Sequence, residues 1–136
     1  MTSTDTRHDA VQHAVQHAAQ ALIDAFARND TEAYFAAFAE DATFLFHTLP
    51  APLLSRAAYR DVWAGWQADG FAVLGCQSRN AHISLQGNVA IFMHDVDTHV
   101  RFGDEESHFS ERETIVFRQH GARWLACHEH LSVKTG

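Results

Sequence analysis

Hydrophobic residues recur every three or four positions over the first fifth of the chain, and this spacing predicts an amphipathic helix over about residues 6–28. Asn29 and Asp30 interrupt the pattern, and a second, short helix is expected from there through Glu40. A third helix is predicted over Arg56–Ala68, where aromatic residues form a stripe and a glycine follows the last turn.

The remaining segments alternate between apolar and polar residues, as strands do. Residues Ala42–His47 are apolar on both faces, which predicts a central strand. Short turns containing glycine separate the later strands and indicate an antiparallel meander. These later strands are expected at residues 71–86, 89–102, 107–118 and 123–133. The whole chain, residues 1–136, is therefore predicted to form a single α+β domain, with three N-terminal helices packed on a curved, mostly antiparallel sheet.

Alternation also assigns side chains to the face that the helices cover. Three titratable residues, His94, Glu113 and Glu129, fall on this largely apolar face, which is the usual composition of a small-molecule pocket. Counting back from a turn near residues 120–121 places Glu113 opposite about residue 128, so the two glutamates are expected to be diagonal neighbours. The expected ligand-binding walls are Tyr34, Trp63, Trp66, Phe92, Val96, Ile115 and Leu131.

The opposite face is predicted to carry Arg112, Thr114, Trp124, His128 and His130. Its aromatic and polar character favours a homodimer formed through the sheets. His128 and His130 also have the spacing of two metal ligands on one strand face. Hydrogen bonding to Arg112 and Thr114 is the favoured interpretation of this pair, and no metal is expected.

Composition narrows the classes of partner. Ten Lys and Arg residues against 17 Asp and Glu give a net charge of −7, which argues against nucleic acid as a partner. No apolar run is long enough to cross a membrane, and the first residues do not resemble a signal peptide, so we expect a cytoplasmic location. The chain contains no phosphate-binding loop or cysteine–zinc motif, and no cofactor is predicted.

The C-terminal third resembles a known family. Arg112-Glu113-Thr114, His120-Gly121, Trp124 and the segment from His128 to Ser132 are similar to the pattern of SnoaL-like domains in the nuclear transport factor 2-like superfamily. The same segment is similar to the association domain of calcium/calmodulin-dependent protein kinase II. The resemblance implies a cone-shaped fold, a pocket between sheet and helices, and a dimer. Arginines line the pocket of the kinase association domain, whereas the matching positions here are Val96, Ile115 and Leu131, which favours a neutral, apolar ligand over an acidic one.

The sequence is compatible with two functions. One is an acid–base enzyme of the isomerase, dehydratase or cyclase type, with His94 as base and protonated Glu113 or Glu129 as acid. The other is a non-catalytic module for ligand binding or dimerisation.

Overall fold

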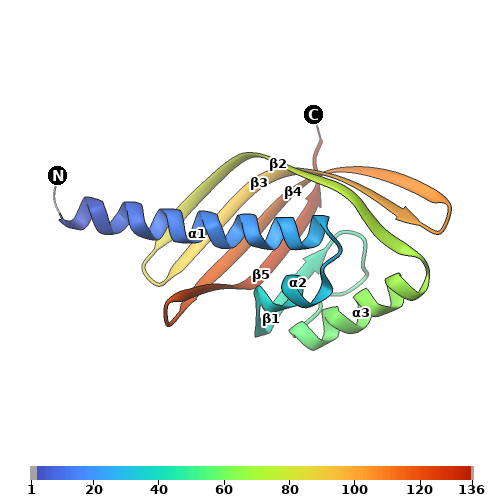
Figure 1. Cartoon of the computed structure of the whole chain (residues 1–136), viewed down its shortest axis with the longest axis horizontal. Helices are drawn as coiled ribbons and strands as arrows, with labels where there is room; N and C mark the ends of the chain where they lie inside the picture. Colours follow the sequence, from blue (N-terminus) through green and yellow to red (C-terminus); the bar gives the residue numbers. More distant parts are fainter. Residues whose placement is uncertain (1–2, 136) are drawn as a thin grey trace.

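The computed structural model describes residues 3–135, and it shows three helices covering one face of a curved five-stranded sheet (Figure 1). The N-terminal half of the first helix extends past the edge of the sheet, while its C-terminal half lies over the strands (Figure 1). In chain order the elements are α1 (Ser3–Ala27), α2 (Thr31–Ala36), β1 (Phe38–Phe46), α3 (Arg56–Ala68), β2 (Phe71–Gln86), β3 (Val89–Phe102), β4 (Glu105–His120) and β5 (Arg123–Val133).

The α+β prediction and the meander of long strands are confirmed, and the bounds of α3, β2, β3 and β5 are those expected. The prediction that the first strand is central is wrong. The strand order is β1-β5-β4-β3-β2, so β1 lies at the edge and pairs with β5 in parallel. Phe44 and Phe46 of β1 are buried against the helices, whereas Leu45 faces the open side of the sheet and is 41% exposed.

The second helix is shorter than predicted, since α2 ends at Ala36 and strand β1 begins only two residues later. The Asp30 side chain caps α2 by accepting a hydrogen bond from the backbone N–H of Ala33. Before it, Asn29 has a φ of +59° and binds the backbone of Val73 in β2 with both ends of its amide, at 2.9 and 2.7 Å. These bonds hold the end of α1 to the sheet.

Strand β5 contains a bulge that sequence alternation did not reveal. Cys127 is an extra residue in β5 that has no pairing partner on β4, so the alternation of side-chain directions is reversed at this point. Before the bulge, Trp124 and Ala126 face the helices, and after it Glu129 and Leu131 do. The prediction that Trp124 belongs to the outer face is therefore wrong, and its side chain is part of the core at 8% exposure.

Aromatic side chains fill the part of the core between α2, β1 and α3. Tyr34 and Phe35 of α2 pack against Phe38 of β1 and against Tyr59 and Trp63 of α3, with ring centroids 5.1 to 6.3 Å apart. Such clusters fix the helices because buried aromatic rings contribute large areas and prefer tilted or edge-on contacts. The position of the tyrosine hydroxyls at the site follows from this packing.

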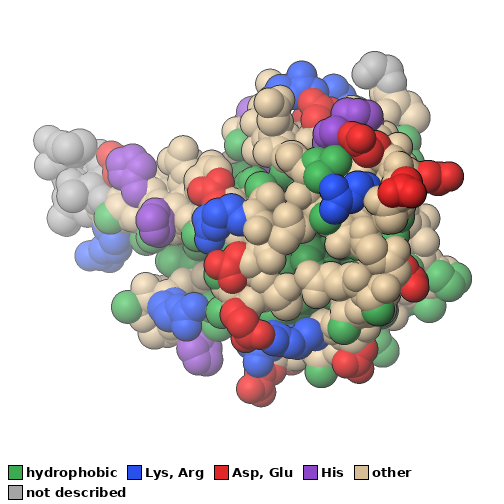
Figure 2. Space-filling model, turned by 45° about the vertical axis from the view of Figure 1, so that its right-hand side comes forward, with side chains coloured by type: hydrophobic (Ala, Val, Ile, Leu, Met, Phe, Trp, Pro, Cys, Tyr) green, Lys and Arg blue, Asp and Glu red, His purple; other side chains and the backbone are tan. Residues whose placement is uncertain are grey.

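Acidic and basic side chains are interspersed on the face of the molecule seen in Figure 2, and no basic patch gathers there. In the part of the chain that the structure describes, no helix has the length and apolar character needed to span a membrane.

Candidate functional site

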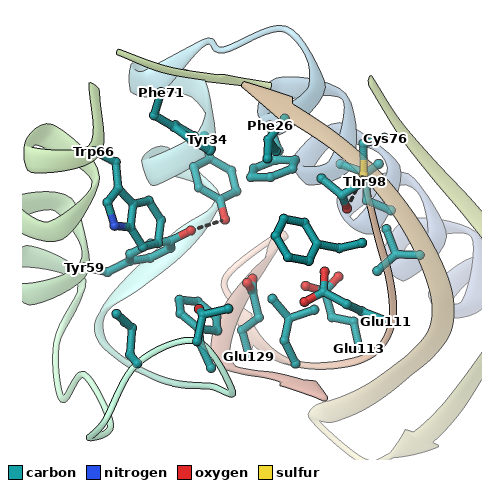
Figure 3. Close-up of a pocket in the computed structure, with 18 of the residues that line it drawn as sticks. Phe26, Tyr34, Tyr59, Trp66, Phe71, Cys76, Thr98, Glu111, Glu113 and Glu129 are labelled. Atoms are coloured by element: carbon teal, nitrogen blue, oxygen red, sulfur yellow. Dashed lines mark hydrogen bonds between the residues drawn. The ribbon is translucent and has the colours of Figure 1, made fainter. Parts of the chain in front are cut away.

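A cavity of about 230 Å³ lies between the helices and the inner face of the sheet. Aromatic rings from all three helices and from strands β1 to β4 line it together with aliphatic side chains, and Figure 3 shows the carboxyl groups reaching it from the sheet. Its aromatic lining residues are Phe26, Tyr34, Phe46, Tyr59, Trp66, Phe71, Phe102 and Phe109. The volume is below the roughly 300–1,000 Å³ of sites for drug-sized molecules, so the cavity suits a smaller ligand.

Three carboxyl groups face this cavity: Glu111 and Glu113 from β4, and Glu129 from β5. No Lys, Arg or His side chain is among the described residues that line it. Glu113 pairs directly with Leu131 rather than with residue 128, because the bulge and the position of the turn shift the register. Glu113 and Glu129 are nevertheless diagonal neighbours on one face, as the sequence predicted.

Glu129 is almost completely buried, and one of its oxygens, Oε2, has no hydrogen-bond partner among the described residues. Burial raises the pKa of this carboxyl well above its usual value, and the charge of neighbouring Glu113 and a hydrogen bond to it raise the pKa further. This shift favours the protonated form of Glu129, and its Oε2 is buried without a hydrogen-bond partner among the described residues.

Glu113 has a different environment. Its Oε1 lies 2.7 Å from Nε2 of His94, and Nδ1 of the same imidazole lies 2.6 Å from Oγ of Ser78. The His94 side chain has no exposed surface and does not line the cavity. The structure thus brings His94, Glu113 and Glu129 together on the inner face, but it places His94 behind Glu113, where it cannot touch a ligand.

A second carboxyl–imidazole pair, between Glu111 and His47, was not found from the sequence. Alternation did place Glu111 on the same face as Glu113, but His47 lies just after β1, and its approach to β4 depends on the tertiary fold. Burial raises the pKa of Glu111, while the hydrogen bond to His47 lowers it and partly offsets that effect.

The two tyrosines form a hydrogen-bonded pair in the cavity wall, with their hydroxyl oxygens 2.9 Å apart (Figure 3). Burial raises the pKa of both Tyr34 and Tyr59 well above the usual value, and the charge of Glu129 adds to the shift. Both hydroxyls are therefore neutral donors. Burial and Glu113 also raise the pKa of the Cys76 thiol to about 12, so this cavity residue is not a thiolate nucleophile at neutral pH.

The predicted ligand-binding residues divide into two groups. Tyr34, Trp66, Val96 and Leu131 line the cavity. Trp63, Phe92 and Ile115 do not, because their side chains are buried in the hydrophobic core. Alternation identified their face correctly but could not distinguish residues under the helices from residues at the cavity.

On the outer face, Arg112 and His130 are exposed, and Thr114 and His128 are half-buried. His128 bonds through Nδ1 to Oγ1 of Thr43 on β1, at 2.8 Å, rather than to β4 as expected. Among residues 3–135, no three His, Cys, Asp or Glu side chains gather closely enough to hold a metal ion. The homodimer stays a prediction, now without Trp124, and a single-chain mass by light scattering at micromolar concentration would contradict it.

The family model of the SnoaL-like domain matches residues 15–135, nearly the whole described chain. The protein belongs to the SnoaL-like domain family. No curated protein sequence matches this SnoaL-like chain.

Solved structures with the nuclear transport factor 2-like fold resemble this SnoaL-like domain throughout. A candidate scytalone dehydratase from Novosphingobium aromaticivorans is 17% identical with a TM-score of 0.82, and the match covers 97% of this chain and 89% of that one. A candidate dehydratase of this fold from Streptomyces avermitilis is 18% identical with a TM-score of 0.75, covering 94% and 99%. A candidate calcium/calmodulin-dependent kinase II association domain from Exiguobacterium sibiricum is 13% identical with a TM-score of 0.78, covering 93% and 95%. At these identities the likeness shows the fold, a cone-shaped arrangement of helices on a curved sheet.

Proposed function

We propose that this SnoaL-like protein is an acid–base enzyme that moves a proton on a small, neutral, largely apolar substrate carrying a carbonyl group. The observation that carries the proposal is the contrast between two neighbouring carboxyl groups in one apolar cavity. Glu113 is hydrogen-bonded to an imidazole, whereas Glu129 is buried, protonated and unpaired at Oε2. Pairs of titratable groups whose environments differ in this way are typical of sites with separate base and acid roles.

In this reaction Glu113 is the base. Its carboxylate takes a proton from a carbon next to the substrate carbonyl, and the electron pair of that C–H bond forms a carbon–carbon double bond. The carbonyl π electrons move onto oxygen, where Glu129, with its proton turned from Glu113 to the substrate, donates a hydrogen bond to the developing negative charge. Return of the proton from Glu113 to another carbon completes an isomerisation, and loss of a β-hydroxyl group as water, with a proton supplied by the acid, completes a dehydration.

The tyrosine pair supports the same assignment. One hydroxyl of Tyr34 and Tyr59 donates to the other, so one O–H of the pair is free to donate to a substrate oxygen. The charge of the wall supports a neutral substrate, because three carboxyl groups and no cationic side chain among the described lining residues disfavour an anion. Two of the similar structures are candidate dehydratases, which is consistent with this class of chemistry.

Hydrogen–deuterium exchange tests the proton transfer without knowledge of the natural substrate. Small cyclic and aromatic ketones are incubated with the protein in D₂O, and exchange next to the carbonyl is followed by NMR or mass spectrometry. We expect exchange above the buffer rate, reduced about 10²- to 10⁴-fold in Glu113→Gln and about 10²-fold or more in Glu129→Gln. Glu105→Gln, at an exposed position at the start of β4, is the matched control and should exchange like the wild type.

Two results would contradict the proposal. Exchange that is unchanged in Glu113→Gln would show that another group is the base. Binding of these ketones in the cavity, detected by NMR shifts of its aromatic residues, without any exchange would instead identify a non-catalytic binding module.

A further inference from the structure

Three adjacent strands bring Ser78, His94 and Glu113 into one hydrogen-bonded chain. Ser78 is on β2, His94 on β3 and Glu113 on β4, and His94 stands directly opposite Glu113 in the sheet register. The chain runs from Ser78 Oγ to His94 Nδ1 at 2.6 Å and from His94 Nε2 to Glu113 Oε1 at 2.7 Å. Only Glu113, at its end, lines the cavity.

The partners of the two ring nitrogens select one form of the imidazole. A neutral histidine has one protonated nitrogen, which donates, and one unprotonated nitrogen, which accepts. An ionised carboxylate only accepts hydrogen bonds, so the nitrogen that faces Glu113, Nε2, carries the proton. Nδ1 must then accept, and its partner is the Ser78 hydroxyl, which is free to rotate and donate.

We propose that Ser78 is a positioning residue that fixes the tautomer of His94, so that His94 donates from Nε2 to Glu113 and orients this carboxylate as the base. The catalytic part of this inference rests on the proposed function, whereas the assignment of the tautomer rests on the two hydrogen-bond partners of His94 and on an ionised Glu113. In the opposite tautomer Nε2 would carry a lone pair facing Glu113. Glu113 would then have to be protonated to make the same hydrogen bond, and a protonated carboxyl cannot act as a base.

The surroundings of Glu113 leave His94 as its nitrogen donor. The charge of Glu113 raises the pKa values of Glu111, Glu129, Cys76, Tyr34 and Tyr59, and none of these five neighbours is a cation. Helix α1 adds only Leu22, Ile23 and Phe26 to the cavity wall. The orientation of the Glu113 carboxyl therefore depends on this hydrogen bond from His94, since no arginine or lysine is among the described residues that line the cavity.

The same three residue types occur in nucleophilic triads, but the geometry here does not support that role for Ser78. Its hydroxyl is bonded to the far nitrogen of His94 and does not line the cavity, so no substrate in the cavity reaches it. The acid, not the serine, faces the cavity. In a nucleophilic triad the serine faces the substrate and the acid lies behind the histidine, whereas here these two positions are exchanged.

The tautomer can be measured directly by ¹⁵N NMR of protein labelled at the histidine ring nitrogens, with the His94 signals identified from their loss in His94→Gln. We expect Nδ1 of the wild type to be of the unprotonated, pyridine type and Nε2 to be of the protonated, pyrrole type. Ser78→Ala should convert His94 into a mixture of tautomers, since Nδ1 loses its donor. Ser78→Thr, which keeps the hydroxyl, should restore the wild-type signals, and Ser84→Ala on the same strand is the matched control.

The ketone exchange reaction supplies the second readout. Ser78→Ala should lower the exchange rate at saturating ketone at least about tenfold, and Ser78→Thr should recover it, because loss of the correct histidine tautomer is costly even where geometry is kept. A wild-type His94 that is protonated at Nδ1, or at both nitrogens, would overturn the inference, as would unchanged signals in Ser78→Ala. The predicted tautomer in a wild type that exchanges no ketone would support the role of Ser78 toward His94 and count against the proposed function alone.

Discussion

Glu129→Gln should stabilise the protein at neutral pH, and the gain should depend on pH in a defined direction. Burial raises the pKa of Glu129 well above the value of 4.5 that the same carboxyl has in an unfolded chain. The folded state therefore binds more protons than the unfolded state at any pH between these two pKa values. Under this condition stability falls as the pH rises, because unfolding releases a proton.

The expected size follows from the same linkage relation. When the folded state holds one proton more than the unfolded state, the free energy of unfolding falls by about 1.4 kcal/mol per pH unit. The loss begins near pH 4.5 and ends where Glu129 ionises in the folded protein. Glutamine has nearly the same shape and never ionises. The difference in unfolding free energy between Glu129→Gln and the wild type should thus grow by about 1 kcal/mol from pH 4.5 to 5.5, and then by up to about 1.4 kcal/mol per pH unit until Glu129 ionises in the folded protein.

Urea unfolding at a series of pH values from about 4 to 8 measures this difference, and groups that do not contact Glu129 contribute equally to both proteins and cancel. Glu105→Gln, at an exposed position, should show no comparable trend. A difference that stays flat from pH 4.5 to 7 would refute the argument that Glu129 is neutral. So would a wild type that gains stability over Glu129→Gln as the pH rises, since that is the behaviour of a well-paired carboxylate.

Other substitutions test how the structure holds the site. Trp124→Ala should lower the free energy of unfolding by about 3–5 kcal/mol because the ring is buried. His130→Ala, on the outer face, should change it by less than about 0.5 kcal/mol. Similar values for both variants would contradict the inner position of the tryptophan. Asn29→Ala should cost about 2–3 kcal/mol in urea unfolding, because two backbone groups of β2 lose their partner. Gly70→Ala should lower the free energy of unfolding by about 1–3 kcal/mol, since φ is +88° and a Cβ would lie 2.9 Å from a backbone nitrogen. Gly65→Ala, in the middle of α3 where a Cβ would meet no atom, should instead raise the free energy of unfolding by about 0.5–1 kcal/mol. Thermal or urea unfolding measures both changes.

Local patterns were sufficient to predict most of the elements. The third helix and the strands β2, β3 and β5 have the expected bounds because amphipathic periodicity, glycine turns and alternation are properties of neighbouring residues. The place of β1 in the sheet is not such a property. Its parallel pairing with β5 joins residues about 85 positions apart, for example Thr43 and His128, and nothing in the local sequence indicates which strand lies beside it.

The sequence predicted which face of the sheet the candidate site residues occupy, but not how deeply each residue is buried. Alternation placed His94, Glu113 and Glu129 on the helix-covered side, and the structure does bring them together. It could not show that His94 is covered completely and is linked to the cavity through Glu113, because coverage depends on tertiary packing. For the same reason Ser78 gave no signal, since its role depends on the hydrogen bond that it makes to a residue of the next strand.

The bulge at Cys127 explains how one strand serves both the closed core and the cavity. With uninterrupted alternation, any register that turns Trp124 toward the helices would turn Glu129 away from them, because the two positions differ by an odd number of residues. The extra residue reverses the direction once, so that a tryptophan fills the core near the start of β5 while a carboxyl faces the cavity further along. Bulges are found beside active sites for this purpose, since they change where a side chain points without ending the strand. The bulge is therefore what allows a buried tryptophan and the buried acid of the proposed chemistry to share one face of the same strand.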